Sequence, residues 1–184
     1  HFQNTMEILD KNINILLVEK PLCINSKEGK EIIKKAKLKN ITLYINFNRR
    51  YDPDFIKIKN KYSTLPKHII FRYSKGLYNY GSHFIDFVID WFGKIQEVKA
   101  DSSIESSNKF NDPNINFTLK TKSGINCNAI AINHINFDQF EIDLFYSDFK
   151  ITFRNGGTEK YIMHKKNNLY YPSYAQLLMP NNNK

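Results

Sequence analysis

The chain has 184 residues, of which 41% are hydrophobic and 14% aromatic, enough for a packed core. Its formal net charge is +9, but the lysines are scattered rather than gathered into an arginine-rich stripe, which disfavours nucleic-acid binding. Cys23 and Cys127 lie far apart, so neither a disulfide framework nor a zinc site is expected. No apolar run approaches the roughly 20 residues that span a bilayer. We therefore expect a soluble, cytoplasmic protein without a membrane partner.

The first 50 residues alternate helical and strand patterns. Residues 2–9 carry apolar side chains at helical spacing. Residues 13–21, INILLVEKP, form a near-continuous apolar run that predicts a parallel strand buried on both faces. Ser26 is the expected N-cap of a helix over residues 27–40, and residues 41–48 predict a second strand. This rhythm is typical of a doubly wound α/β sheet.

The pattern changes after residue 50. Pro53, preceded by Asp52, predicts the start of another helix. Residues 68–75 predict a strand, residues 76–93 predict a loop that runs into a helix, and a short helix is expected within residues 169–184. Turn signals separate the remaining segments, which have strand character. These strands cover residues 94–106, 114–124, 125–137, 139–147, 149–157 and 159–165. We expect an antiparallel meander, and hence an α+β domain behind an α/β domain.

Lys20 lies where the first strand gives way to a loop, after Glu19 and before Pro21. Ligands of open α/β sheets bind at the carboxyl ends of the strands. A lysine at this point can hydrogen-bond a cofactor ribose or a substrate hydroxyl, and its charge can lower the pKa of that hydroxyl. The alternative is a strand-end lysine in solvent.

The stretch GLYNYGSHFIDFVIDWFG, residues 76–93, places a histidine in the first turn of its helix. At 3.6 residues per turn, His83 shares a side with Asp86 and Asp90, and apolar residues supply the core face. A carboxylate one turn away can fix the imidazole tautomer and raise its basicity. His83 could then accept a proton from a carbinol as hydride leaves. The alternative is an ordinary salt bridge on the helix surface. No second histidine nearby supports a metal site, so none is expected.

Three segments, taken together at their spacing, resemble the Gfo/Idh/MocA family of NAD(P)-dependent sugar oxidoreductases. They are HFQNTMEILDKNINILLVEKPL, NFNRRYDP and GLYNYGSHFIDFVIDWFG. The resemblance implies reversible hydride transfer between a sugar carbinol and NAD or NADP. Lys20 matches the family's catalytic lysine, His83 matches its general acid/base, and Asp86 matches the acid that follows. Other residues that the resemblance places at the site are Glu19, Pro21 and His1 beside the cofactor, and Arg50, Asn79 and Asp86 beside the substrate.

The resemblance also implies a fold and an assembly. Residues 1–50 would be the C-terminal part of a Rossmann domain. Residues 51–184 would form an α/β domain whose large, mainly antiparallel open sheet provides a face for homo-oligomerisation. The match covers nearly the whole chain.

The sequence departs from the family pattern in two ways. No Gly-x-Gly-x-x-Gly occurs in it, so we expect the chain as given not to bind NAD(P) in the usual way and to be inactive. Asn79 stands four residues before His83, where the family usually has Asp, and an amide cannot relay a proton. Relatives that act on nucleotide-linked sugars look similar at this position, which favours a sugar or nucleotide-sugar substrate and a role in glycan biosynthesis. The alternative is a non-catalytic module for oligomerisation or sugar sensing.

Overall fold

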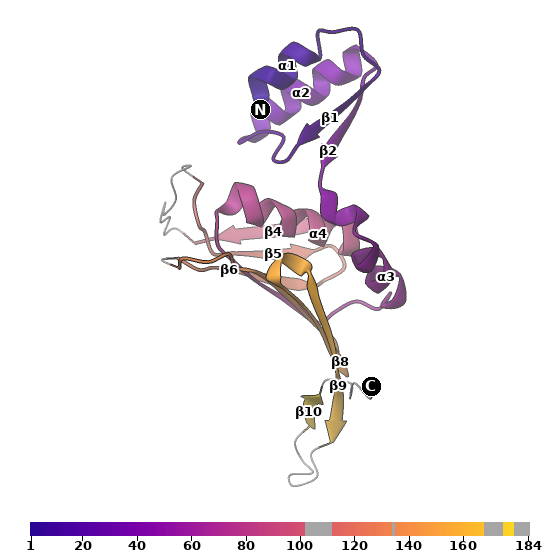
Figure 1. Cartoon of the computed structure of the whole chain (residues 1–184), viewed down its shortest axis with the longest axis vertical. Coiled ribbons are helices and arrows are strands. Elements are labelled where there is room, and N and C mark those ends of the chain that lie inside the picture. Colours follow the sequence, from indigo (N-terminus) through magenta and orange to yellow (C-terminus); the bar gives the residue numbers. More distant parts are fainter. Residues whose placement is uncertain (102–111, 134, 168–174, 179–184) are drawn as a thin grey trace. The chain divides into compact units, whose positions relative to one another are not determined.

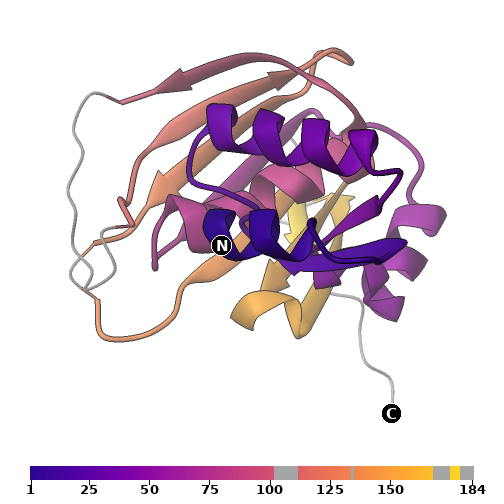
Figure 2. The same ribbon diagram turned by 90° about the horizontal axis from the view of Figure 1, so that it is seen from above.

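The computed structural model describes residues 1–101, 112–133, 135–167 and 175–178. The chain divides into two compact units, His1–Ile58 and Lys59–Lys184. Figure 1 labels the helices and strands of both units, and Figure 2 shows the same ribbon from above. None of the helices in these ranges is long and apolar enough to cross a membrane.

The first unit is a βαβ element preceded by a short helix. Its order is α1 (Phe2–Ile8), β1 (Ile15–Glu19), α2 (Ser26–Leu38), β2 (Thr42–Asn46), a 3₁₀ turn (Asn48–Tyr51) and α3 (Pro53–Lys61). The strands β1 and β2 pair in parallel, in a register that runs from Ile15 opposite Thr42 to Glu19 opposite Asn46. The order predicted from the sequence is confirmed, including the start of α3 at Pro53. The N-cap of α2 is Asn25 rather than Ser26, because the Asn25 side chain accepts the Glu28 N–H at 2.9 Å.

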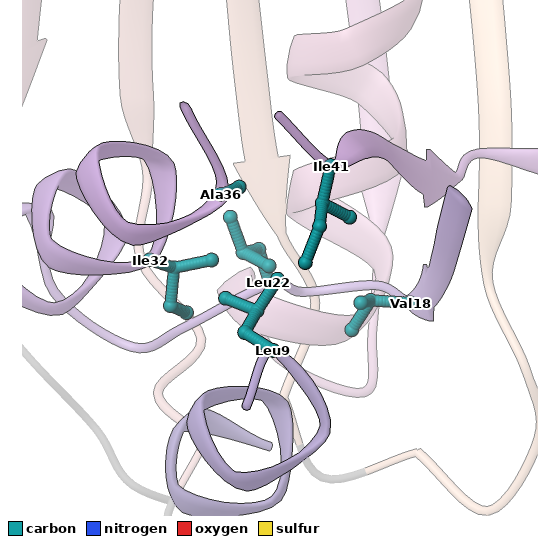
Figure 3. Close-up of a cluster of buried hydrophobic side chains, with 6 residues drawn as sticks. All are labelled: Leu9, Val18, Leu22, Ile32, Ala36 and Ile41. Atoms are coloured by element: carbon teal, nitrogen blue, oxygen red, sulfur yellow. The ribbon is translucent and has the colours of Figure 1, made fainter. Parts of the chain in front are cut away.

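The core of this unit lies on one face of the parallel pair, where α1 and α2 cover it. Figure 3 shows six side chains converging there from α2, from β1 and from the residues that follow α1, follow β1 and precede β2. They are Leu9, Val18, Leu22, Ile32, Ala36 and Ile41, none more than 9% exposed. Full burial of a Leu or Ile side chain contributes about 1.5–3 kcal/mol. The prediction that β1 is buried on both faces is wrong, since Ile15 and Leu17 are 66% and 64% exposed.

The second unit is built on one large sheet. Its elements are β3 (His68–Tyr73), a π-helical turn (Leu77–Gly81), α4 (Ser82–Phe92), β4 (Ile95–Ala100), β5 (Phe117–Thr121), β6 (Asn126–Ala131), β7 (Phe140–Phe145), β8 (Phe149–Arg154), a 3₁₀ turn (Asn155–Gly157), β9 (Glu159–Asn167) and β10 (Ala175–Leu178). The described residues form eight strands in the order β10-β9-β8-β7-β3-β6-β5-β4.

The sheet is mainly antiparallel, as predicted, but it is not a simple meander. β3 lies between β6 and β7, parallel to β6 and antiparallel to β7. The two antiparallel runs, β4 to β6 and β7 to β10, therefore flank a central strand that comes earlier in the chain. Of residues 169–184, where a short helix is expected, the structure describes residues 175–178, which form β10 and pair with β9 instead. The part of the predicted strand 94–106 that follows Asp101 lies outside the described residues.

The core of the second unit is aromatic. Phe84 of α4 stacks on Phe71 of β3, with ring centroids 4.4 Å apart and planes 12° apart. Phe71 also contacts Tyr73 and Phe140, both almost fully buried. Farther along α4, Trp91 meets Phe153 of β8 edge-on. Such pairs add about 0.5–1.5 kcal/mol beyond the area that they bury. The face of α4 that packs on the sheet is thereby fixed.

The opposite face of the sheet carries a charged network at its centre. The Asp143 carboxylate of β7 accepts Arg72 Nη2 at 2.8 Å and Thr152 Oγ1 at 2.6 Å. Lys150 Nζ lies 3.0 Å from the same carboxylate, and Glu141 also binds Arg72. Burial alone would raise the pKa of Asp143, but the bonds from Thr152, Lys150 and Arg72 outweigh it and lower the pKa below its usual value.

Candidate active site

The carboxyl ends of β1 and β2 carry candidate site residues of the first unit. Glu19 and Asn46 are register partners, and Asn46 Nδ2 donates to Glu19 Oε1 at 2.7 Å. Lys20 follows directly and is half-buried, and the Lys20–Pro21 peptide bond is cis. The sequence analysis missed Asn46, although a polar residue that ends the second parallel strand could have been found by the same rule as Glu19.

Two further candidates lie elsewhere in the first unit. His1 is exposed and immediately precedes α1, and its carbonyl accepts the Thr5 N–H at 3.0 Å. Arg50 is exposed in the 3₁₀ turn after β2, where its N–H donates to the Phe47 carbonyl at 3.1 Å. Both residues present their side chains from short segments at the surface.

The candidate site residues of the second unit lie at the start of the helix over residues 77–92. The N–H groups of Tyr80 and Gly81 both donate to the Gly76 carbonyl, at 3.0 and 3.2 Å, and Ser82 N–H donates to the Leu77 carbonyl. These bonds make a π-helical turn, which is wider than an α-helical turn and is frequent at functional sites. Asn79 lies within this turn. The predicted loop and helix are present, with the π turn as an addition.

His83 and Asp86 follow on the first turns of α4. His83 is 9% exposed and Asp86 8% exposed, so His83 lies in the interior and not on the helix surface that the alternative interpretation required. The imidazole meets the Phe140 ring edge-on, with centroids 6.5 Å apart. Asp90, predicted on the same side of the helix, accepts Lys59 Nζ at 2.8 Å. A buried imidazole and a buried carboxylate three residues apart, on a helix whose other buried residues are apolar, are typical of functional sites.

Residues 112–114, named here the DPN strap, hold the backbone of the π turn. Asp112 accepts the Tyr78 N–H with Oδ1 and the Asn79 N–H with Oδ2, both at 2.8 Å. The Pro113 carbonyl accepts the Leu77 N–H at 2.8 Å. Asn114 Oδ1 accepts the Gly76 N–H at 2.7 Å. The sequence pattern Asn-Asp-Pro-Asn was interpreted only as a turn signal, and nothing in it indicates which distant amides it binds.

Chemically, the two units offer different groups. The first unit provides the Lys20 ammonium, and the second provides the His83 imidazole, the Asp86 carboxylate and the Asn79 amide. A cation that polarises a hydroxyl and an imidazole that takes its proton suit proton transfer at an alcohol. Among the described residues, no three His, Cys, Asp or Glu side chains are arranged to bind a metal ion.

Comparisons with known proteins point to one group of enzymes. No family model matches the chain. The curated scyllo-inositol 2-dehydrogenase (NADP(+)) IolW of Bacillus subtilis is 25% identical over 130 residues, which cover 59% of this chain and 36% of that protein. The solved UDP-N-acetylglucosamine 3-dehydrogenase GnnA of Acidithiobacillus ferrooxidans superposes with a TM-score of 0.72 at 13% identity, over 100% of this chain and 61% of that one. An NADPH-dependent oxidoreductase of Desulfitobacterium hafniense gives a TM-score of 0.75 at 13% identity, over 98% and 61%.

The fold is therefore that of the oxidoreductases that join a parallel α/β domain to a large mixed sheet. The chain that carries the Glu-Lys-Pro strand end, the Asn-x-Arg segment and the helix of His83 is similar to these oxidoreductases in fold and, over 130 residues, to the curated dehydrogenase in sequence. The chain spans about 60% of the length of the solved structures and 36% of that of the curated relative.

Proposed function

We propose that the chain carries catalytic groups of an oxidoreductase that transfers hydride between a sugar or nucleotide-sugar carbinol and NAD or NADP. The observation that carries the proposal is the buried pair His83 and Asp86, one turn after Asn79, at the end of α4 that the DPN strap fixes. In this proposal residues 1–50 belong to the cofactor domain and residues 51–184 to the substrate domain.

The cofactor fits the carboxyl end of the first unit in part. Lys20 is a half-buried cation at the edge of the sheet where α/β proteins bind nucleotides, and Glu19 beside it is oriented by Asn46. These residues would hold the nicotinamide end of NAD(P), which would accept or return the hydride. The 184 residues contain no Gly-x-Gly-x-x-Gly to hold the pyrophosphate.

The remaining steps belong to side chains of this chain. Lys20 would donate a hydrogen bond to the substrate hydroxyl and, through its charge, stabilise the alkoxide that forms as the hydroxyl proton leaves. His83 would accept that proton in the oxidation direction and return it in the reduction direction. Asp86 would hold the imidazole in the tautomer that this requires. Asn79 would hydrogen-bond a second substrate hydroxyl without taking part in proton transfer.

The test is nicotinamide reduction by sugar substrates. The assay uses the 184-residue chain and the longest reading frame that contains it, with NAD and NADP, against inositols, free hexoses and UDP-linked N-acetylhexosamines. Lys20→Met and His83→Ala should each lower kcat/KM at least about 100-fold, the range of general acid–base catalysis. Lys34→Met, at an exposed position of α2, is the control and should be active. Turnover that survives both substitutions would contradict the assigned roles.

We propose further that the face of the sheet opposite α4 mediates homo-oligomerisation. Ile130 of β6 is 45% exposed on this face, beside the network of Arg72 and Asp143. Exposed apolar patches mark protein–protein contacts, and the resemblance noted from the sequence implies an oligomer face on this sheet. Light scattering should give a dimer or larger assembly for the natural chain and a smaller species for Ile130→Glu. A monomer at micromolar concentration would contradict this proposal. It would also contradict the alternative function, in which the chain is a non-catalytic oligomerisation module.

A further inference from the structure

The helix that bears Asn79 and His83 is held at its start by a distant part of the chain. A helix leaves its first four N–H groups without partners inside the helix. Here these groups belong to residues 76–79, and every one of them donates to the DPN strap. The cap is thus supplied by residues 112–114 and not by the residue that precedes the helix, as in a common N-cap.

The strap is itself anchored to the sheet. Asn114 Nδ2 donates to Asn133 Oδ1 at 2.7 Å. The Tyr73 hydroxyl, at the end of β3, donates to the Ile115 carbonyl at 2.6 Å and accepts the Ile115 N–H at 3.1 Å. Burial raises the pKa of Tyr73 to about 12, so this hydroxyl keeps its proton for the first of these bonds. The strap therefore connects the start of the helix to the central strand.

The DPN strap packs so closely against the start of the helix that a side chain at residue 76 would clash with it. Gly76 has φ +89°, and a Cβ atom at this position would lie 2.0 Å from Asp112 Cγ. Asp112 and Asn114 are only 8% and 5% exposed. Because the Asp112 carboxylate already accepts two N–H groups at this end of the helix, it also complements the positive end of the helix dipole.

The π turn sets the angular offset between Asn79 and His83. In a regular α-helix, residues four apart lie on one face. The wider π turn holds one more residue per hydrogen-bonded ring, which changes the angle about the helix axis between Asn79 and His83 from its value in a regular α-helix. Two of the bonds from the strap, those to the N–H groups of Tyr78 and Asn79, fall inside the π turn.

We propose that Asp112 and Asn114 are positioning residues, which fix the π turn through its backbone N–H groups and thereby direct Asn79 and His83 toward the substrate. The proposal rests on the function proposed above for His83. Asp112 and Asn114 act only through the backbone of residues 76–79 and do not take part in proton transfer.

The experiment uses NMR on the 184-residue chain, without cofactor or substrate. Asp112→Ala should accelerate hydrogen exchange of the Tyr78 and Asn79 amides about tenfold, the effect of removing a helix cap, and should shift the His83 ring resonances. Asp112→Asn keeps one carbonyl oxygen, so it should protect one of the two amides and shift His83 less. Asp138→Asn is the matched control, because Asp138 binds Lys75 and the Tyr80 hydroxyl beside the same turn. It should leave the exchange of both amides and the His83 ring unchanged.

A purely structural role for Asp112 gives a different result. It would lower the stability of the protein but leave the His83 resonances of the folded state unchanged in both Asp112 variants, which overturns the proposal. An equal His83 shift in Asp138→Asn would overturn it too. If Asp112→Ala does not fold, as judged by exchange of the Ile69 and Phe71 amides of β3, the isosteric Asp112→Asn decides by the same criterion. The amide exchange rates and the His83 resonances can be measured without turnover, so they test the positioning role even if the proposed function is wrong. Conversely, enzymatic activity alone would not support the positioning role.

Discussion

Gly76→Ala is expected to be the most destabilising glycine substitution in the second unit. Gly76 has φ 89° and ψ 159°, a conformation that costs a residue with a side chain about 1–3 kcal/mol. The added methyl group would also lie 2.0 Å from Asp112 Cγ and 2.2 Å from its Oδ2. The carboxylate must therefore move and give up its bonds to Tyr78 and Asn79, and a hydrogen bond to a charged group contributes about 1.5–3 kcal/mol. Strain plus the loss of both bonds amounts to about 4–9 kcal/mol, a large part of the 5–15 kcal/mol that stabilises a typical domain.

Gly124→Ala separates the backbone strain from the loss of the Asp112 hydrogen bonds. Gly124 has φ +88°, but nothing lies within 4 Å of the position of its missing Cβ. This variant should lose only the backbone part, about 1–2 kcal/mol. Both variants can be compared by urea unfolding, followed through the fluorescence of Trp91, the single tryptophan of the chain, which packs on Phe87 of α4. Free energies of unfolding that agree within about 1 kcal/mol for the two variants would refute the close contact between Gly76 and Asp112.

Three other substitutions test separate parts of the structure. Leu9→Ala removes a fully buried side chain from the core of the first unit and should cost about 2–5 kcal/mol, measured as faster hydrogen exchange in β1. Tyr73→Phe leaves the half-buried polar groups of Ile115 without the hydroxyl and should cost about 1–3 kcal/mol in urea unfolding. Asp143→Asn should destabilise the protein at neutral pH. Because the folded-state pKa of Asp143 is lowered, its contribution is complete above the ordinary pKa of about 3.9 and is lost as the pH falls through the folded-state pKa. The difference between Asp143→Asn and the natural chain should therefore shrink below about pH 4 in acid unfolding curves.

The sequence was sufficient for most of the elements because their signals are local. The apolar run before Glu19 and the Asp52-Pro53 pair each determine a structure within a few residues, and both elements are present where predicted. The position of β3 between β6 and β7 was not predictable in this way. Each of these strands has the same alternating pattern, and only the packing of α4 on the sheet decides which strand is central.

The candidate site, like the fold, could be predicted from the sequence only where its signals are local. His83 and Asp86 could be placed on one helix from their spacing alone, and the structure adds that both are buried. Asp112 and Asn114 could not be found, because their bonds to residues 76–79 join segments that are far apart in the chain. A short polar sequence indicates a turn, but the identity of its distant partners depends on the tertiary fold.

The charged centre of the sheet also limits which surfaces can bind to this face. A flat apolar surface laid over Arg72 and Asp143 would remove their remaining contact with water without offering new hydrogen bonds, a cost that dispersion contacts do not readily offset. This network thus favours selective binding. Only a surface with matching polar groups could bind over Arg72, Asp143 and Lys150 at a low free-energy cost.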